Sequence, residues 1–281
     1  MKIRIVIDST TDIPEEIKNR VSIVPLTVNF AGKEYVDGVD ITKREFYEKL
    51  IECNALPTTS QPSPAAFEKE YDEAKKNGEA VIVITLSSEL SGTYRSAKTA
   101  SEEYDNVYVV DGRNATIGTA ILTELALQMV DKGESPENIV KKLNEEKNNI
   151  CVVAMLDTLE YLRLGGRISR LASIAGEILS IKPVIGIKDG AIKILGKARG
   201  SKQGNNLLIK QIEEAGGIDF KKTLLLGYTG LSNHILLKYI DDSSHIWMGN
   251  VEELRTVMVG SIIGTHTGPG GIAVAFFKNR T

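Results

Sequence analysis

A buried strand followed directly by a helix, at residues 81–104, places the strongest constraint on the fold of this chain. The run VIVITL at residues 81–86 is rich in β-branched residues, which is typical of a strand covered on both faces of a parallel sheet. Apolar residues then recur at helical spacing, at Tyr94, Ala97, Ala100 and Tyr104. Strands and helices alternate up to about residue 150, which predicts a parallel, doubly wound α/β domain.

The first half of the chain carries signals for several further elements. Strands are expected at residues 3–7, 21–30 and 107–110. Thr42 and Glu45 form a capping box that predicts the start of a helix through Leu50. Other helices are expected after Pro14, between the proline-rich segment 57–64 and Gly78, and at residues 115–132 and 136–147.

The second half is expected to form a separate mixed α/β domain. A length of 281 residues is large for one core, so we predict domains at residues 1–150 and 151–281. Asp189 and Gly190 between two apolar runs predict a hairpin of residues 184–187 and 191–195. The other expected elements are strands at 151–155, 224–228, 245–248 and 272–277, a very apolar helix from Leu171 to Leu179, helices between 228 and 245 and at 251–257, and a tight glycine-rich loop at 259–271.

Composition excludes several classes of function. The net charge is −3 with both signs mixed, which argues against a nucleic-acid surface. The chain starts directly with a strand pattern and contains no long apolar segment, so we expect a cytoplasmic protein. Cys53 and Cys151 have no metal-like spacing, and we expect buried thiols rather than a disulfide.

Hydroxyl groups follow the strands of the first half. Ser91, Gly92 and Thr93 come where the strand at 81–86 gives way to a helix, and the unpaired N–H groups of a helix start attract anions. A carboxylate or phosphate would fit there, although Ser91 could equally be a simple N-cap. Thr59 and Ser60 lie in the rigid segment 57–64, which either presents hydroxyls to a ligand or acts only as a stiff connector.

The second half contributes a guanidinium and an imidazole. Arg167 follows two glycines that would let the backbone approach a ligand, although a surface arginine after a turn is common. His266 stands in the constrained glycine-rich stretch. Lys197, Arg199 and Lys202 form a small basic cluster, which is either a docking surface or ordinary solvated surface.

Taken together, the motifs resemble the DegV family of bacterial lipid-binding proteins over nearly the whole chain. Each motif is weak alone, but their order and spacing are specific. They are DSTTDIP at residues 8–14, TSQP at 59–62, SSELSGTY at 87–94, YL at 161–162 with GGRI at 165–168, and GTHTGPG at 264–270.

The resemblance implies a two-domain α/β protein that encloses one long-chain fatty acid between its domains. Ser91, with the adjacent Gly92, would bind the carboxylate, supported by Thr59 or Ser60, by Arg167 and by His266. No cofactor is implied. In that family a separate ATP-dependent fatty acid kinase phosphorylates the bound carboxyl group, giving an acyl phosphate for phospholipid synthesis, so this chain would supply substrate and not chemistry.

Three departures from the family pattern stand out. Gly112 replaces a common serine, Leu164 replaces a lysine, and Lys197, Arg199 and Lys202 stand where the family has a denser basic run. The first two leave ligand binding largely untouched, whereas the third bears on docking of the kinase.

Two other functions compete with lipid binding. Ser91 and His266 could be the nucleophile and base of an esterase, but Glu89 stands where a Gly-x-Ser-x-Gly elbow needs a small residue. A phosphate or nucleotide binder could use the helix start at 91–93, but the glycine-rich phosphate-binding motifs are missing from the sequence.

Overall fold

The computed structural model describes residues 2–52, 56–168 and 181–279, which form three β-sheets. The first sheet is parallel, with strand order β2-β1-β6-β7. Its strands are β1 (Lys2–Asp8), β2 (Ser22–Val24), β6 (Glu79–Thr85) and β7 (Val107–Asp111). Alternating residues of these strands belong to two different hydrophobic clusters, so both faces of the sheet are buried.

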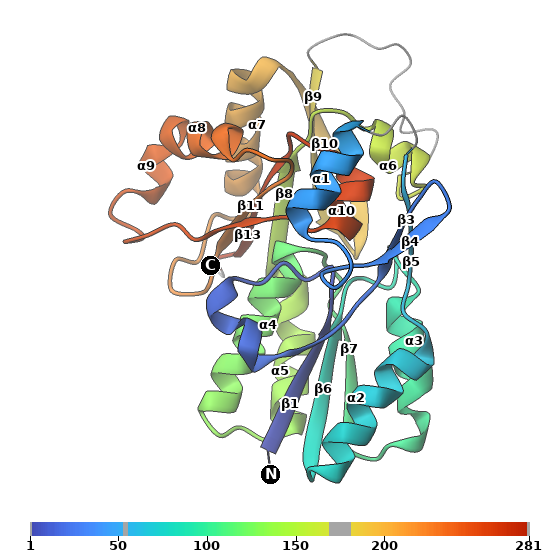
Figure 1. The fold of residues 1–281 in the computed structure, drawn as a ribbon. Coiled ribbons are helices and arrows are strands. Elements are labelled where there is room, and N and C mark those ends of the chain that lie inside the picture. The colour runs from blue at the N-terminus through green and yellow to red at the C-terminus, as the bar shows by residue number, and fades with distance from the viewer. Residues whose placement is uncertain (1, 53–55, 169–180, 280–281) are drawn as a thin grey trace.

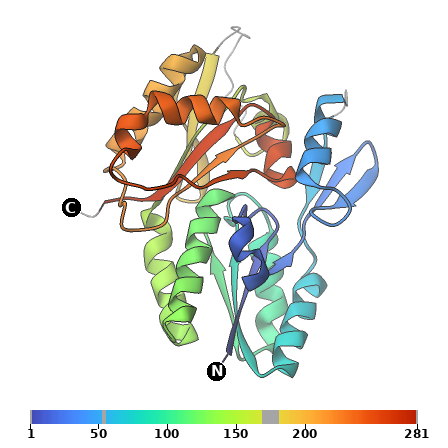
Figure 2. The same ribbon diagram turned by 60° about the vertical axis from the view of Figure 1, so that its left-hand side comes forward.

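Helices cover both faces of this sheet, as Figures 1 and 2 show. One face carries α2 (Pro64–Lys76) and α3 (Thr93–Ala100), and the other carries α4 (Ile117–Asp131) and α5 (Pro136–Glu146). Ser135 caps α5, because its hydroxyl accepts a hydrogen bond from the Asn138 N–H at 3.3 Å. Three short 3-10 helices complete the described part of this half: η1 (Glu15–Arg20), η2 (Ser101–Glu103) and η3 (Lys147–Asn149).

The second sheet is mixed and has the order β10-β9-β8-β13-β11-β12. Only β11 and β12 pair in parallel within it. Its strands are β8 (Ile150–Met155), β9 (Ile181–Lys188), β10 (Ala191–Arg199), β11 (Leu225–Tyr228), β12 (Thr256–Met258) and β13 (Ile272–Phe277). Its outer face packs against α7 (Gly200–Glu214), α8 (His234–Asp242) and α9 (Ser244–Trp247).

A small antiparallel sheet, β4-β3-β5, lies beside the junction of the two larger sheets. It consists of β3 (Thr27–Phe30), β4 (Lys33–Val36) and β5 (Thr58–Ser60). It shares a hydrophobic cluster with α1 (Lys43–Glu52) and α10 (Ser261–Thr267), and α6 (Glu160–Leu164) also packs on α10. Residues from both ends of the chain therefore meet in this region.

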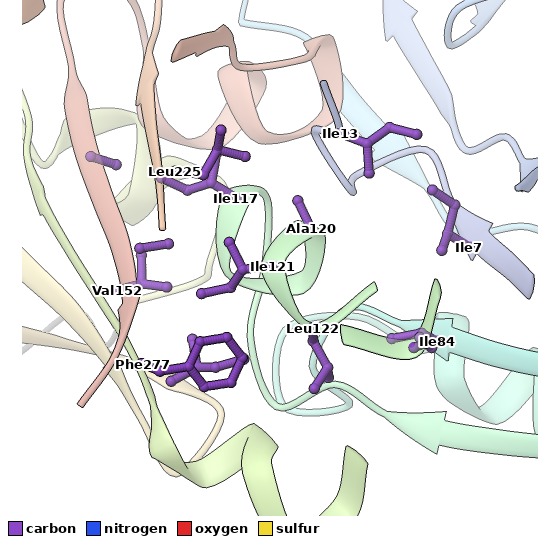
Figure 3. Packing of buried hydrophobic residues seen from close by; sticks show 14 of the residues in the cluster. Ile7, Ile13, Ile84, Ile117, Ala120, Ile121, Leu122, Val152, Leu225 and Phe277 are labelled. Atoms are coloured by element: carbon purple, nitrogen blue, oxygen red, sulfur yellow. The ribbon is translucent and has the colours of Figure 1, made fainter. Parts of the chain in front are cut away.

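Helix α4 connects the two larger sheets through one hydrophobic core. Figure 3 shows Ile117, Ala120, Ile121 and Leu122 between Ile7 and Ile84 of the parallel sheet and Val152, Leu225 and Phe277 of the mixed sheet. All of these side chains are at most 5% exposed. Since α4 is apolar on more than one face, it is stable only between two layers.

The fold class predicted from the sequence is confirmed, with a parallel N-terminal sheet and a mixed C-terminal one. The capping box of Thr42 and Glu45 and the hairpin at Asp189-Gly190 are also present. No helix among the described residues has both the length and the apolar character that crossing a membrane requires.

Three predictions of secondary structure are wrong, at residues 21–30, 57–64 and 259–271. Residues 21–30 form two strands in different sheets, because Pro25 between them has no N–H for a sheet. The connector 57–64 contains a strand, β5, which pairs with β3. The stretch 259–271 is not a loop throughout but contains α10, with Gly260 before it and Gly268, at φ +70°, after it.

Two further predictions are wrong in the segment between β11 and β13. Residues 244–247 are helical, because Trp247 packs on Tyr239 one helix earlier and donates a 2.9 Å hydrogen bond to Ser243. Residues 251–257 do not form a helix, and their end joins the sheet as β12 beside β11. The predicted helix from Leu171 to Leu179, and the Cys53 thiol, lie outside the described residues.

Candidate functional site

A cavity of about 380 Å³ lies between the mixed sheet and the ends of the parallel strands. Its walls come from both halves of the chain and from the small sheet. Leu26, Leu86 and Ala115 line it from the first half, and Leu156, Leu162 and Ile263 line it from the second. Apolar side chains dominate this wall, as expected of a pocket for an apolar ligand.

A row of four residues across the mixed sheet forms one wall of the cavity. The strand register aligns Ile185 with Ala154, Ala154 with Ala273, and Ala273 with Gly227. All four line the cavity. Because three of them are alanine or glycine, the row forms a trough of small residues that runs across strands β9, β8, β13 and β11.

The six residues predicted for ligand binding all line this same cavity: Thr59, Ser60, Ser91, Gly92, Arg167 and His266. They come from β5, the loop before α3, the segment after α6, and α10. Segments more than 200 residues apart in the sequence meet here, since Thr59 Oγ1 lies 2.9 Å from His266 Nε2.

The loop before α3 holds Ser91 by local contacts. The N–H groups of Leu90 and Ser91 donate to the Ser87 carbonyl at 3.0 and 3.2 Å, which turns the chain after β6. Gly92, and not Ser91, occupies the N-cap position. The Ser91 hydroxyl lies 2.9 Å from the Thr93 hydroxyl and accepts a 3.3 Å hydrogen bond from the Thr93 N–H.

Gly92 is required by the close approach of Gln61. A Cβ atom at Gly92 would lie 2.0 Å from Gln61 Oε1, so a larger residue would displace the glutamine. Gln61 also donates a 2.9 Å hydrogen bond to Ser96 on α3. The segment 57–64 is thereby fixed against the start of α3, with Thr59 and Ser60 facing the cavity.

His266 is a largely buried, neutral imidazole. Burial is the main cause that lowers its pKa to about 4, and the positive charge of Arg167 adds to this effect. A Cβ atom at Gly165 would lie 2.2 Å from His266 Nδ1, so this glycine lets the backbone pack against the ring. Nδ1 is buried and has no hydrogen-bond partner among the described residues.

Arg167 joins the segments on either side of the cavity. Its guanidinium donates to the Gly165 carbonyl at 2.6 Å and to the Leu90 carbonyl at 3.3 Å. Burial lowers the pKa of Arg167 below its ordinary value, but an arginine remains protonated at neutral pH. No carboxylate is among the described residues that line the cavity, so its polar end favours an anion.

Asp12 holds the segments around the site together, a role that the sequence did not predict. It forms a 2.6 Å ion pair with Lys43 and accepts hydrogen bonds from the Thr116 hydroxyl at 2.6 Å and the Gly260 N–H at 2.8 Å. Thr116 lines the cavity with φ at +49°, an uncommon backbone for threonine. Asp12 belongs to the DSTTD motif, which is visible in the sequence, but its partners are too distant in sequence to be predicted.

The remaining predicted positions lie elsewhere. Lys197, Arg199 and Lys202 are exposed on β10 and at the start of α7, away from the cavity wall. No cluster of three or more histidine, cysteine or acidic residues suited to a metal ion is present in the described part of the chain. Ser91 bonds to Thr93 and His266 bonds to Thr59, contacts that give no support to an esterase dyad.

Comparison with known proteins gives consistent matches over the full chain. A family model described as "Uncharacterised protein, DegV family" matches residues 2–279. A DegV domain-containing protein of Caldanaerobacter subterraneus subsp. tengcongensis is 38% identical over 285 aligned positions, which cover 99% of both chains.

Solved structures with the same fold include proteins described as binding fatty acids. A fatty-acid-binding DegV family protein of Thermus thermophilus is 32% identical, with a TM-score of 0.87 over 99% of this chain and 100% of that one. A stearic acid-binding protein of Eubacterium ventriosum is 29% identical, with a TM-score of 0.87 over 99% and 98% of the two chains. The fatty acid binding protein DegV of Bacillus subtilis is 30% identical, with a TM-score of 0.85 over 99% and 100%.

Proposed function

The chain belongs to the DegV family, and from this premise we propose that it binds one long-chain fatty acid in the cavity between residues 1–150 and 151–281. We treat these two segments as its domains. The carboxylate lies at the polar end beside Ser91 and Arg167, and the acyl chain follows the trough of small residues. Fatty acids bound by similar structures support this proposal.

The observation that carries the proposal is a largely apolar cavity wall that also contains a group of polar side chains, Thr59, Ser91, Arg167 and His266. Each buried methylene contributes about 0.8 kcal/mol, so the acyl chain supplies most of the affinity. The carboxylate must still be paired, because an unpaired buried charge is costly by several kcal/mol. The Ser91 and Thr59 hydroxyls and the Arg167 guanidinium are suitable donors at this end.

The neutral imidazole of His266 suits a carboxylate as well. A neutral ring offers one N–H donor, and its protonated form is disfavoured by burial and by Arg167. The ring and the Thr59 hydroxyl form a hydrogen-bonded pair that can reorient toward a ligand. The guanidinium is the single formal positive charge among the described wall residues, and it matches the single negative charge of a fatty acid.

We further propose that this chain is a carrier and that a partner, an ATP-dependent fatty acid kinase, phosphorylates the bound carboxyl group. The resemblance to the DegV family motivates this step. Lys197, Arg199 and Lys202 are exposed and available for docking. Changing all three to glutamine should then weaken acyl phosphate formation with the kinase of the same organism while the lipid content of the purified protein stays the same.

Organic extraction of the natively purified protein, followed by mass spectrometry, tests the ligand. We expect close to one fatty acid per chain, with a defined range of chain lengths. An unrelated protein purified in parallel is the control. Extracts without fatty acid, or extracts equal to the control, would refute the proposal, and hydrolysis of an aryl ester that disappears in Ser91→Ala would favour the esterase instead.

A further inference from the structure

A second cavity, of about 440 Å³, lies beside the first and differs from it in chemistry. The two cavities share the wall residues Val152, Gly186 and Ile187. None of the six residues at the polar end of the first cavity is among the described residues that line the second. Its polar side chains come from the β7–α4 loop, η3, the β9–β10 turn, α7 and the end of β13.

Positive charge is concentrated in this second cavity, although the whole chain has a net charge of −3. Of its two carboxylates, Glu214 is already engaged, since it accepts a 2.6 Å hydrogen bond from Gln211 and pairs with Lys210 at 3.5 Å. The other carboxylate, Asp189, is exposed. Four cations line the cavity: Arg113, Lys147, Lys188 and Lys278.

Lys188 and Lys278 are the two cations available to a ligand. Within the described residues, neither ammonium group forms an ion pair or a side-chain hydrogen bond. Both line the cavity together with Cys151. Their positive charges act to lower the pKa of the Cys151 thiol, which burial raises to about 11. The four cations outnumber the two carboxylates, Asp189 and Glu214, among the lining residues, and this excess of positive charge creates a local field that an anion would relieve.

Lys147 and Arg113 add to this field from the other half of the chain. Burial is the main cause that lowers the pKa of Lys147; the Asp111 carboxylate acts against it and the Arg113 guanidinium adds to it. Arg113 donates to the Asp189 carbonyl and pairs with Glu89 at 3.5 Å. It thus holds the β9–β10 turn against the β7–α4 loop and closes one side of the cavity.

The walls of this cavity are fixed in position. Arg113 and Asp189 both have φ at +53°, a backbone that non-glycine residues adopt only where their surroundings hold it. A Cβ atom at Gly190 would lie 2.4 Å from the Ser87 hydroxyl, so the turn packs closely on the loop after β6. The β9–β10 turn and the β7–α4 loop are therefore packed against each other at one side of the cavity.

We propose that the second cavity binds a small phosphate-bearing anion, with its phosphate oxygens between Lys188 and Lys278. Lysine ammonium groups act as point charges that suit phosphate. No aromatic ring is among the described residues that line the cavity, so a stacking surface for a nucleobase is missing there. The volume exceeds that of an ion-sized hole, and pyrophosphate is a suitable probe.

Calorimetric titration of the full-length protein with pyrophosphate tests the site. We expect saturable binding to the wild type, and a dissociation constant raised about tenfold or more in Lys188→Gln/Lys278→Gln. Inorganic phosphate, titrated in parallel, should bind more weakly, since it carries fewer charges. ATP should bind no better than pyrophosphate, because the site offers no surface for the base.

Lys98→Gln/Lys238→Gln is the matched control, since it removes the same charge from exposed positions outside the cavity. An equal loss of affinity in this control would show non-specific attraction and refute the proposal. Absence of saturable binding to the wild type, or unchanged affinity in Lys188→Gln/Lys278→Gln, would also refute it. The fatty acid content of every variant is measured as well, and it should stay unchanged because the site is separate.

Discussion

Ser91 lines the first cavity, and in the proposed function its hydroxyl is the main hydrogen-bond donor to the fatty acid carboxylate. This hydroxyl contacts Thr93 on its own loop. Ser91→Ala removes one hydrogen bond to a charged group, and we expect the dissociation constant for fatty acid to rise about tenfold or more. Titration of lipid-depleted protein with a fluorescent fatty acid measures this change.

Ser88→Ala is the control for Ser91→Ala. Ser88 lies on the same loop, but its hydroxyl donates to the carboxylate of the half-buried Asp111 at 2.5 Å and does not line the cavity. Its substitution should leave fatty acid affinity unchanged. If Ser91→Ala binds as tightly as Ser88→Ala, the role given to the Ser91 hydroxyl is wrong.

His266 links the site to pH through its lowered pKa of about 4, against 6.5 for a free histidine. The fold favours the neutral ring, so this contribution to stability is complete above pH 6.5 and is lost as the pH falls toward 4. The loss amounts to about 3 kcal/mol at most. Urea unfolding between pH 7 and 4 measures the difference in free energy of unfolding between the wild type and His266→Gln. This difference should become smaller, or change sign, as the pH falls.

The wild type must be compared with His266→Gln because Asp8 titrates in the same pH range as His266. Burial raises the pKa of Asp8 to about 6, so its contribution to stability is greatest at low pH and is lost as the pH rises toward 6. Asp8 is common to both proteins, and the difference between them isolates His266. A gap that stays constant with pH would contradict the buried, neutral state of His266.

At the level of elements, Gly264 sets the spacing between α10 and α1. A Cβ atom there would lie 2.7 Å from Phe46 Cε1 and from Tyr47 Oη, both fully buried. We expect Gly264→Ala to push the helices apart and lower the free energy of unfolding by about 1–3 kcal/mol. Urea unfolding measures the loss, and fatty acid affinity should fall as well because α10 carries His266.

A second substitution that removes the steric overlap tests why Gly264→Ala lowers stability. Phe46→Leu opens space on α1, so the combined variant with Gly264→Ala should lose less stability than the sum of the two single variants. Strict additivity would show that overpacking between α1 and α10 is not the cause.

The trough of small residues in the mixed sheet is expected to determine which acyl chains fit. Ala273→Val adds two methyl groups to the cavity wall, and valine is favoured in strands. Mass spectrometry of extracted lipid should show a shift to shorter chains or lower occupancy. Ala275→Val, two residues along in the packed core, should lower stability without changing the chain-length profile; the same profile in all three proteins would contradict the assignment of the trough.

The sequence was sufficient to predict elements whose signals are local. The buried strand at 81–86 and the hairpin at Asp189-Gly190 are examples, since burial pattern and turn chemistry determine each of them within a few residues. The helical residues 261–267 were not predicted, because glycines around them indicated a loop. Glycine is needed at position 264 because Phe46 and Tyr47 pack closely against it. This is a tertiary contact, which the local sequence does not reveal.

The candidate site shows the same division between local and distant information. Ser91, Arg167 and His266 could be singled out from their neighbours in sequence, as hydroxyl, guanidinium and imidazole groups in constrained settings. Their meeting at one cavity depends on pairing of segments far apart, such as β3 with β5 and β8 with β13. Gln61, which packs on Gly92, belongs to a quoted motif, but only the fold shows its contact.

At the scale of the whole molecule, a ligand in the first cavity would connect the two halves. Helix α4 already joins the two large sheets through the shared core, and Asp12 joins the loop after β1 to α1 and to Gly260 before α10. The cavity wall takes residues from both halves of the chain, so one bound ligand would contact both of them. A ligand that binds only the folded state raises the free energy of unfolding. The increase grows with the logarithm of the ratio of the free ligand concentration to the dissociation constant.

Hydrogen exchange with and without fatty acid tests this connection. We expect oleate, added to lipid-depleted protein, to slow exchange both in the loop 86–92 and in strands β9 and β13, because a single ligand would contact all of them. The β4 strand and α5, which do not line the cavity, provide internal controls. Protection confined to one half would mean that the ligand does not lie between the two sheets, since a molecule bound there cannot order one wall of the cavity and leave the other unchanged.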